Sequence, residues 1–380
     1  MNISQVKNCA DCGMCVTLCP NQAITVKTDG LFYQPEIDFS KCTDCGLCLN
    51  RCPVNNTVTD HKSKSAFYAV NRDDDIVKKS SSGGVFSALA DVVLKQGGVV
   101  FGAAFSGYCK EIVIKSTDEV DLDELRRSKY AESLTGDSFV QVKEQLRLGK
   151  KVFYCATPCQ IAGLKAYLNK DYKDLITCDF VCGGLPSHKI YREYIEYLEE
   201  KFDSRVTSVN FRPKTYGWRE YTIKVNFENG REYLKQACLD PYFSAFLHHR
   251  YTIRELCVDC PFPSARCSDI TLADFWGYRS IIGKTDSNKG ISLVFANTDR
   301  GAEELELIGE KTELNSIPLE KVSSSFERHG VPENYREKRE AFMKDYKLSG
   351  IVSAGKKHCV YKGKKAFKAR LRVIKNNLKG

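Results

Sequence analysis

The chain has 380 residues, with 57 Lys and Arg against 48 Asp and Glu, a formal net charge of +9 and 18 cysteines. This length leaves room for a small domain and a larger one with its own core. The first residues lack the charged and apolar regions of a secretory signal, and no uncharged apolar run approaches the length of a membrane span. We therefore expect a cytoplasmic chain, where so many cysteines indicate metal ligands because disulfides do not persist there.

Eight of the cysteines form two copies of one pattern, CxxCxxCxxxCP. The first copy holds Cys9, Cys12, Cys15 and Cys19, and the second holds Cys42, Cys45, Cys48 and Cys52. This is the spacing of bacterial ferredoxins, in which three thiolates of one motif and the fourth of the other hold each [4Fe–4S] cluster. We expect one cluster on Cys9, Cys12, Cys15 and Cys52, and a second on Cys42, Cys45, Cys48 and Cys19. A disulfide framework and two zinc sites are the alternatives, but zinc does not require this spacing.

Residues 23–41, between the two cysteine motifs, predict a strand pair with a turn at Asp29-Gly30. The segments after the second motif predict a second, larger domain. Further strands are predicted at 66–70, 98–105, 151–156 and 175–182, and helices at 85–97, 138–149, 161–168 and 190–202. This alternation implies a largely parallel sheet with functional loops at the strand ends. Residues 206–213 and 221–234 predict an antiparallel insertion with a turn at Asn229-Gly230.

The later cysteines separate into two groups. Cys159 directly precedes a helix, where backbone N–H groups favour a thiolate, and Cys257 and Cys260 form a CxxC with Cys267 seven residues later. Because no thioredoxin-like arrangement precedes this CxxC, we interpret it as part of a third cluster or a zinc site. Cys182 lies on a loop just after a predicted strand, and the other five are expected to be small buried apolar side chains: Cys109, Cys155, Cys178, Cys238 and Cys359.

From residue 66 to about 330 the chain resembles the coenzyme F420 hydrogenase/dehydrogenase beta subunit family. The resemblance is carried by SSSGGVFSALA, GGVVFGAAF, RRSKYAESLTGDSF, KVFYCATPCQIAGLKAYL, CDFVCGGLPS, FRPKTYGW and CVDCPFPSARCSDITLADFWG. An ordered series of motifs is more specific than any single one. It implies an iron–sulfur flavoprotein with FAD in the second domain, a further [4Fe–4S] cluster and a substrate site over the flavin ring.

The resemblance also implies roles for individual residues. It places the third cluster on Cys159, Cys182, Cys257 and Cys260, with Cys267 as the first substitute. It places flavin contacts at Ser81, Ser82, Gly83 and Gly84, where backbone N–H groups can approach a ligand closely. Lys129 and Tyr130 are similar to catalytic or flavin-contacting residues, and Asp269, Asp274 and Trp276 are expected near the site. The alternatives are a flexible loop for the glycines, a solvated helix end for Lys129 and a turn cap for the aspartates.

We therefore expect an α/β (α+β) protein. A ferredoxin-like dicluster domain at 1–57 and a linker at 58–65 precede a mixed-sheet α/β flavin-binding domain at 66–345, and a basic tail with a C-terminal helix occupies 346–380. The expected function is an oxidoreductase that passes electrons between a low-potential donor and an organic small-molecule substrate through [4Fe–4S] clusters and FAD, in the reductase direction. The resemblance allows ferredoxin or reduced coenzyme F420 as the donor. The alternatives are an electron-transfer subunit that feeds a partner hydrogenase, dehydrogenase or surface-polysaccharide enzyme, and a scaffold with structural metal sites only.

The net charge of +9 has two explanations other than nucleic-acid binding. Each [4Fe–4S] core with four thiolates carries about −2, so three clusters would lower the net charge from +9 to about +3. The remaining positive charge is concentrated in the tail from Lys356, which contains ten Lys or Arg and no acidic residue. Phe367, Leu371, Ile374 and Leu378 recur there at helical spacing, so this helix can lie on the inner membrane surface or on a partner, and the alternative is a solvated helix or one packed on the chain itself. Without aromatic platforms or a nucleic-acid-binding fold, we expect no nucleic acid partner.

Overall fold

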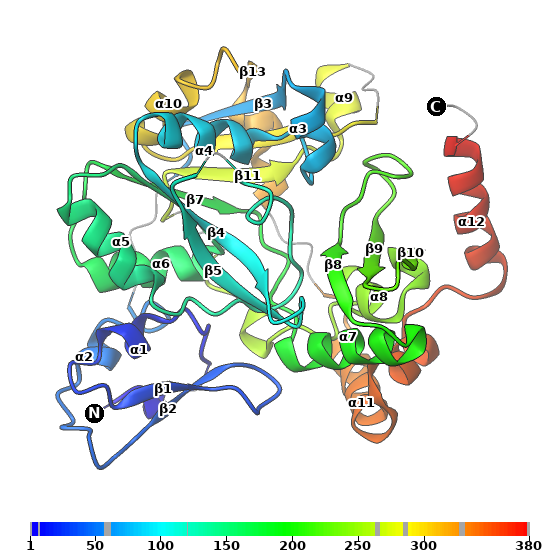
Figure 1. The fold of residues 1–380 in the computed structure, drawn as a ribbon, viewed down its shortest axis with the longest axis horizontal. Coiled ribbons are helices and arrows are strands. Elements are labelled where there is room, and N and C mark those ends of the chain that lie inside the picture. The colour runs from blue at the N-terminus through cyan, green and yellow to red at the C-terminus, as the bar shows by residue number, and fades with distance from the viewer. Residues whose placement is uncertain are drawn as a thin grey trace.

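The structure is a computed structural model that describes residues 2–6, 8–56, 62–119, 121–262, 267–283, 288–326 and 331–377. Residues 58–61 of the expected linker lie outside these ranges, as do Leu378 and Lys379 of the tail. The first 56 residues form a small unit beneath a large sheet, and a separate three-stranded sheet lies beside it (Figure 1).

The N-terminal unit contains the expected pair of strands. β1 (Ile24–Lys27) and β2 (Gln34–Ile37) are antiparallel, with Ile24 opposite Ile37. Two short helices, α1 (Met14–Leu18) and α2 (Leu47–Asn50), begin inside the two cysteine motifs. Each helix follows a glycine in the left-handed region, Gly13 at φ 80° and Gly46 at φ 73°, a conformation that costs glycine little. The two motifs therefore share one loop-and-helix geometry.

The large sheet has eight strands in the order β13-β3-β12-β11-β7-β6-β4-β5. Its strands are β3 (Ser65–Asn71), β4 (Val99–Ser106), β5 (Glu111–Thr117), β6 (Val152–Cys155), β7 (Leu175–Phe180), β11 (Ile270–Asp274), β12 (Ser292–Ala296) and β13 (Thr312–Ile317). The four central strands β11, β7, β6 and β4 run parallel to one another. The expectation of a largely parallel sheet is therefore wrong: β5 follows β4 after the short turn at 107–110, which is too short for a crossover, and the other outer strands also pair antiparallel.

Helices cover both faces of this sheet. α4 (Val85–Lys95) and α10 (Asp299–Glu306) lie over one face, and α5 (Ser138–Arg147) and α6 (Pro158–Leu168) lie over the other (Figure 1). In β6, Val152 and Tyr154 pack with α5 and α6, whereas Phe153 packs with α4, as the alternation of side chains along a strand requires. Short helices α3 (Asp74–Lys79) and α9 (Tyr278–Ile282) flank β3 and β11.

The insertion has the expected antiparallel form. β8 (Val206–Asn210), β9 (Thr222–Phe227) and β10 (Glu232–Gln236) pair in the order β10-β9-β8, with α7 (His188–Phe202) before them and α8 (Pro241–Leu247) after them. The fold class, a mixed α/β protein with a dicluster unit at its N-terminus, is confirmed.

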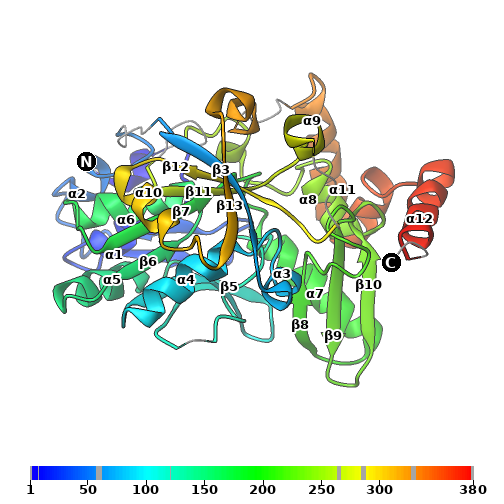
Figure 2. The same cartoon turned by 90° about the horizontal axis from the view of Figure 1, so that it is seen from above.

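Two helices complete the chain. α11 (Tyr335–His358) packs against α7 and α8, bends at Gly350 and runs through residue 345, where the sequence suggested a boundary. α12 (Gly363–Asn377) lies at the edge of the molecule in both ribbon views (Figures 1 and 2). Among the described residues, no helix combines the length and the apolar character that crossing a membrane requires.

Candidate functional site

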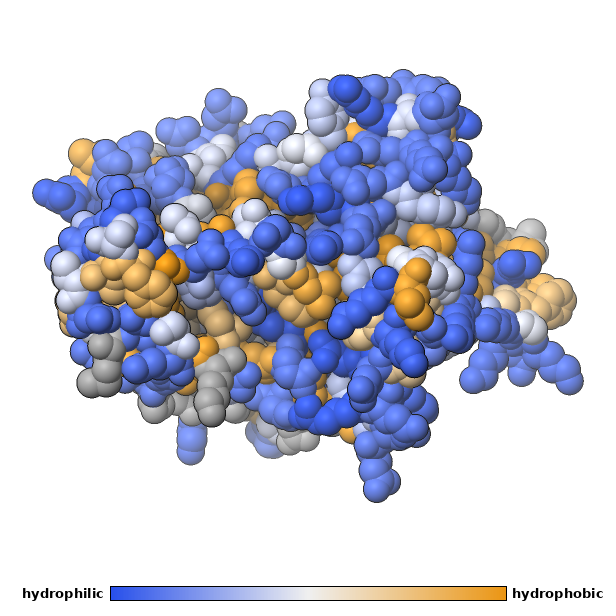
Figure 3. Space-filling view, turned by 90° about the horizontal axis from the view of Figure 1, so that it is seen from below, coloured by the Kyte–Doolittle hydropathy of each residue, from blue (hydrophilic) through white to orange (hydrophobic). Residues whose placement is uncertain are grey.

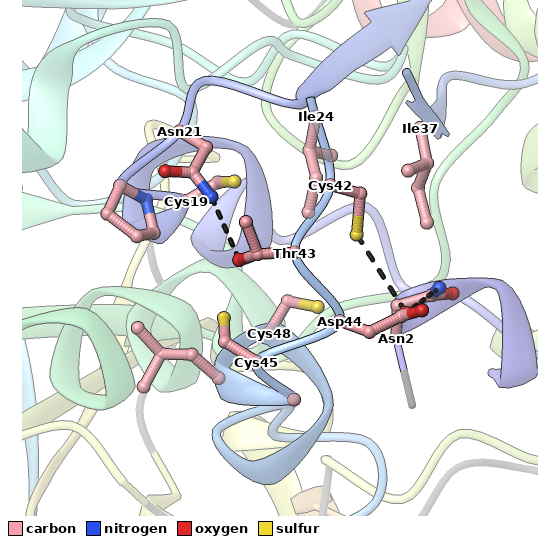
Figure 4. Close-up of a pocket in the computed structure, with 13 residues that line it drawn as sticks. Asn2, Cys19, Asn21, Ile24, Ile37, Cys42, Thr43, Asp44, Cys45 and Cys48 are labelled. Atoms are coloured by element: carbon pink, nitrogen blue, oxygen red, sulfur yellow. Dashed lines mark hydrogen bonds between the residues drawn. The ribbon is translucent and has the colours of Figure 1, made fainter. Parts of the chain in front are cut away.

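The second cysteine motif surrounds a cavity together with one thiol of the first. Cys42, Cys45 and Cys48 line this cavity with Cys19, and Figure 4 shows the four side chains around the same space. Asn2 Nδ2 donates to Asp44 Oδ1 (2.9 Å), and Asn21 Nδ2 donates to Thr43 Oγ1 (3.0 Å), so side chains from two other segments hold the loop. The backbone N–H of Ala23 donates to Cys19 Sγ at 3.4 Å. Cys45 is exposed, which places this set at the surface.

The other four N-terminal thiols also lie together. Burial raises the pKa of Cys15, and its neighbours Cys9 and Cys52 raise it further, so the last thiol of the second motif lies with those of the first. Burial raises the pKa of Cys9 to about 11. Thiols with such pKa values keep their protons at neutral pH unless a metal centre displaces them. The grouping that the ferredoxin spacing predicts is thus the grouping that the fold brings together.

A third set of four thiols comes from three distant segments. Cys159 at the start of α6, Cys182 after β7, and Cys257 with Cys260 line one cavity. Backbone N–H groups of Gly184 and Leu185 donate to Cys182 Sγ and Cys257 Sγ, both at 3.4 Å. Burial raises the pKa of Cys159, and the charges of Cys182, Cys257 and Cys260 act in the same direction.

Cys267 does not line this third cavity. Its Sγ is buried and donates to the carbonyl of Pro158 at 3.6 Å. Within the described ranges, no three side chains of His, Cys, Asp or Glu converge as ligands of a single metal ion. Each of the three groups brings four thiols together, which is the donor set that a [4Fe–4S] cluster takes.

The first and third sets are neighbours. Ala10, between Cys9 and Cys12, lines the third cavity, and the charge of Cys159 contributes to the raised pKa of Cys12, whose main cause is burial. α1 packs on α6 at Gly163, where an added Cβ would lie only 3.1 Å from Cys12 Sγ. Cys48 of the exposed set acts on the pKa of Cys15 in the first set, so the sets follow one another from the exposed Cys45 inward.

A larger cavity adjoins the third set. It has a volume of about 280 Å³, and Cys182 lines both cavities. Its walls are largely apolar, including Phe86, Ile112, Leu125 and Phe246, and it is large enough for part of an organic cofactor or substrate. The cationic side chains along it are Arg126, Arg127, Lys129 and Arg212, against one carboxylate, Asp274.

Lys129 and Tyr130 both line this cavity. Lys129 Nζ donates to the carbonyls of Arg126 (2.6 Å) and Arg127 (3.2 Å). Burial lowers the pKa of Lys129 to about 7, and the nearby charge of Arg127 lowers it further. The Tyr130 ring packs against Phe211 and Phe246, with centroids 5.5 Å and 5.2 Å away.

In the loop 81–84 before α4, three residues line the cavity and one packs against the sheet. Ser81, Ser82 and Gly84 line the cavity, and the N-terminus of α4 has no side-chain cap. Gly83 does not line it. A Cβ on Gly83 would lie 2.4 Å from the carbonyl oxygen of Ala69 and 2.9 Å from the nitrogen of Ser292, so this glycine lets the loop pack against β3 and β12.

Two parts of the chain match known families. Residues 149–322 match the family that describes the C terminus of the "Coenzyme F420 hydrogenase/dehydrogenase, beta subunit". Residues 8–56 match "4Fe-4S dicluster domain", which confirms an iron–sulfur unit at the N-terminal end of the chain. The chain thus combines an iron–sulfur dicluster unit with a region similar to the beta subunits of hydrogenases and dehydrogenases.

One solved structure similar to this chain is the F420-reducing [NiFe] hydrogenase complex from Methanosarcina barkeri, studied by xenon derivatization. The match has 18% sequence identity and a TM-score of 0.48, and covers 80% of this chain and 99% of that one. No curated protein sequence matches the chain.

Buried polar contacts join the dicluster unit to the larger part of the chain. Arg254 and Glu132 form a buried ion pair, and Arg254 also donates to the carbonyls of Tyr33 (2.7 Å) and Cys9 (3.3 Å). Glu132 Oε2 accepts from the backbone N–H of Tyr33 at 3.3 Å and lies 3.0 Å from Nδ1 of His188. The His188 ring stacks on Tyr33 with centroids 3.6 Å apart. These contacts fix the first thiol set relative to the third.

The residues of the SDITLADFWG motif have different positions. Asp269 is buried in the sheet, where it accepts from Thr177 N at 2.8 Å, while Asp274 lines the cavity and the Trp276 ring stacks on the Trp218 ring with centroids 4.4 Å apart.

Sequence reasoning missed Arg126, Arg127, Cys155 and Arg212 as cavity residues. The first two lie in the RRSKY motif and Arg212 in FRPKTYGW, so the motifs gave a signal without identifying these side chains.

Proposed function

We propose that this protein passes electrons from a low-potential donor at the exposed thiol set to an organic substrate in the 280 Å³ cavity, as an iron–sulfur flavoprotein oxidoreductase. The observation that carries this proposal is the serial order of the three thiol sets and the cavity. Cys45 is exposed at one end, and Cys182 lines the cavity at the other. A scaffold with structural metal sites would not require this order.

The proposed ligands follow the three sets. One [4Fe–4S] cluster is held by Cys42, Cys45, Cys48 and Cys19, a second by Cys9, Cys12, Cys15 and Cys52, and a third by Cys159, Cys182, Cys257 and Cys260. The N–H groups that donate to Cys19, Cys182 and Cys257 would stabilise the thiolate form of these side chains. Such clusters supply one-electron transfer, and a flavin supplies the exchange between one-electron and two-electron chemistry.

The large cavity has the chemistry that a flavin requires. Its apolar walls suit the ring system, and the uncapped start of α4 with Ser81, Ser82 and Gly84 offers donors for phosphate oxygens. Arg126 and Arg127 add positive charge beside that loop, since Ser128 N donates to Ser81 Oγ at 2.9 Å. We assign these residues to FAD binding, and Gly83 to the packing that positions the loop.

Lys129 and Tyr130 are the proposed residues at the reacting end. With a pKa near 7, Lys129 can hold or give a proton at neutral pH, which is the property of a general acid. Tyr130 is held by aromatic neighbours and forms part of the wall of the cavity. The low potentials typical of ferredoxin clusters favour the reductase direction.

The proposal also names the electron donor and the surfaces that α12 would contact. Ferredoxin or another redox protein would dock at the exposed Cys45 region, and reduced coenzyme F420 is the alternative donor. The beta-subunit description of the matched family favours a second function, in which the chain feeds a partner enzyme without turnover of its own. α12 would contact an anionic membrane surface or a partner through its exposed apolar residues.

The test changes one thiol of the third set. Cys182→Ser should lower the iron content from about twelve to about eight per chain, because each cluster holds four irons. Cys267→Ser, also close to α6 but outside the cavity, is the matched control and should keep all the iron. Iron and acid-labile sulfide are measured on protein purified without oxygen. Unchanged iron in Cys182→Ser would reject the third cluster as assigned.

A further inference from the structure

Arg212 is held firmly at the wall of the large cavity. It follows β8, and its Nη1 donates to Asp274 Oδ2 at 2.8 Å. The guanidinium lies over the Tyr221 ring, 4.0 Å from the centroid. Its backbone N–H donates to Asn210 Oδ1 at 3.0 Å. Only 4% of the Arg212 side chain is exposed, so the guanidinium has a single well-supported position.

The other terminal nitrogen of Arg212 has no partner in the protein. Nη2 is buried and makes no hydrogen bond. Asp274 accepts from Arg212 Nη1, from the Tyr221 hydroxyl (3.2 Å) and from Trp218 Nε1 (3.3 Å), and makes no hydrogen bond to Nη2. A buried charged donor without an acceptor is costly, and such groups are satisfied by ligands where they line a binding cavity.

We infer that Arg212 recognises a carboxylate or phosphate group of the substrate in this cavity, so that the substrate is an anionic organic molecule. This inference rests on the proposed function and names the substrate class for the same site. A guanidinium binds carboxylate or phosphate through charge-assisted hydrogen bonds, and its planar shape fixes the orientation of the group. The excess of cationic over acidic side chains along the cavity favours the same ligands.

Arg212 belongs to a different part of the wall from the residues assigned to the flavin. Those residues precede α4 or lie just before Lys129, whereas Arg212 comes from the insertion. Its neighbour Phe211 packs edge-on against Tyr130 (5.5 Å between centroids), and Tyr130 contacts Phe246. The substrate group would therefore lie near the proposed reacting end, between a cation and aromatic rings.

Benzoate and inorganic phosphate are the probes for the test, with benzamide as the neutral analogue of benzoate. They are titrated into the FAD-containing protein while the visible flavin spectrum is followed. Arg212→Gln and Arg212→Lys are compared with Arg192→Gln, which alters a half-exposed arginine paired with Glu111 outside the cavity. We expect benzoate to bind wild type and Arg192→Gln equally, with phosphate competing. Arg212→Gln should weaken benzoate at least tenfold at unchanged FAD content, Arg212→Lys should weaken it less, and benzamide should not distinguish the variants.

Three results would overturn the inference. They are wild-type affinity for benzoate in Arg212→Gln, no binding of benzoate or phosphate to wild type, and loss of FAD from Arg212→Gln, which would assign the guanidinium to a flavin phosphate. A wild-type chain without flavin would contradict the proposed function instead. Binding of benzoate is then measured by equilibrium dialysis of the flavin-free chain, and the same tenfold difference between wild type and Arg212→Gln decides the inference.

Discussion

Lys129 shows how one residue acquires chemistry from its surroundings. Burial lowers its pKa to about 7, and the positive charge of Arg127 contributes. An ordinary lysine remains protonated at neutral pH, but Lys129 is divided between its two forms there. Its ammonium group is held by two backbone carbonyls, so protonation does not move the side chain far. The result is an amine that can exchange a proton at the wall of the cavity.

Competitive acetylation with acetic anhydride measures this pKa directly. Only the unprotonated amine reacts, so labelling of Lys129 should rise with pH and reach half of its maximum near pH 7. Lys78 is the control, because its hydrogen bond to the exposed Asp75 and that carboxylate's charge raise its pKa above 10.5. Mass spectrometry of the peptides gives both curves. If Lys129 and Lys78 reached half-maximal labelling at nearly the same pH, the pKa of Lys129 would not be lowered.

At the scale of elements, α6 connects the dicluster unit to the third thiol set. The helix begins with Pro158 and Cys159, and Thr157 and Gln160 form a capping box there. One turn later Gly163 faces the first motif, where an added Cβ would lie 2.8 Å from the carbonyl of Cys12 and 2.9 Å from its Cβ. The absence of a side chain at Gly163 therefore allows two thiol sets to lie close together.

Gly163→Ala should disturb the first thiol set. Because the added methyl group meets backbone atoms of Cys12, the loop has to move, and we expect iron to fall from about twelve toward about eight per chain. Lys165→Ala on the same helix is the control, since alanine is a good helix former and the side chain is only half-buried. Iron and acid-labile sulfide are the readout. Full iron content in Gly163→Ala would show that the packing tolerates the methyl group.

α12 presents exposed apolar side chains on a basic helix. Ala369 is buried against the insertion, whereas Phe367, Leu371 and Ile374 are 62%, 37% and 54% exposed. Figure 3 shows apolar residues among hydrophilic ones at the right end, where α12 lies. The wild-type chain should float with vesicles of phosphatidylcholine and phosphatidylglycerol, and less with phosphatidylcholine alone.

Phe367→Glu should reduce flotation of the chain with the anionic vesicles, because it places a charge within the exposed apolar stripe. Lys364→Ala, which removes one charge and leaves that stripe intact, is the milder control. Equal flotation of wild type and Phe367→Glu would argue for a protein partner or a free helix.

The elements that the sequence predicted well are those with local signals. Cysteine spacing, the turns at Asp29-Gly30 and Asn229-Gly230, and the helices at 85–97 and 190–202 depend on neighbouring residues, and all of these agree with the structure. The direction of the outer strands depends on pairing between distant segments. The role of Arg212 likewise depends on Asp274, which lies 62 residues away in the chain. No local pattern could reveal either.

At the scale of the whole molecule, a buried ion pair holds the dicluster unit in place. Glu132 and Arg254 have side chains 1% and 6% exposed, and both contact backbone of the N-terminal unit. Removing one member of such a pair leaves the other charge uncompensated, which costs more than the pair itself contributes. The thiol sets of the two parts thus keep one relative position instead of depending on a mobile carrier domain.

Glu132→Gln should therefore lower the free energy of unfolding by about 3–5 kcal/mol. Chemical denaturation followed by cluster absorbance measures the change. Asp75→Ala is the control, because its ion pair with Lys78 is exposed and should contribute at most about 1 kcal/mol. If the two variants lose equal stability, the buried pair does not hold the two parts together.

The central claim is that three thiol sets hold clusters in series beside a flavin cavity. The most direct test is to purify the full chain without oxygen and to measure iron, acid-labile sulfide and flavin per polypeptide. The account predicts about twelve irons, about twelve sulfides and one FAD. About eight irons without flavin would contradict it and would leave only the dicluster unit as a redox centre.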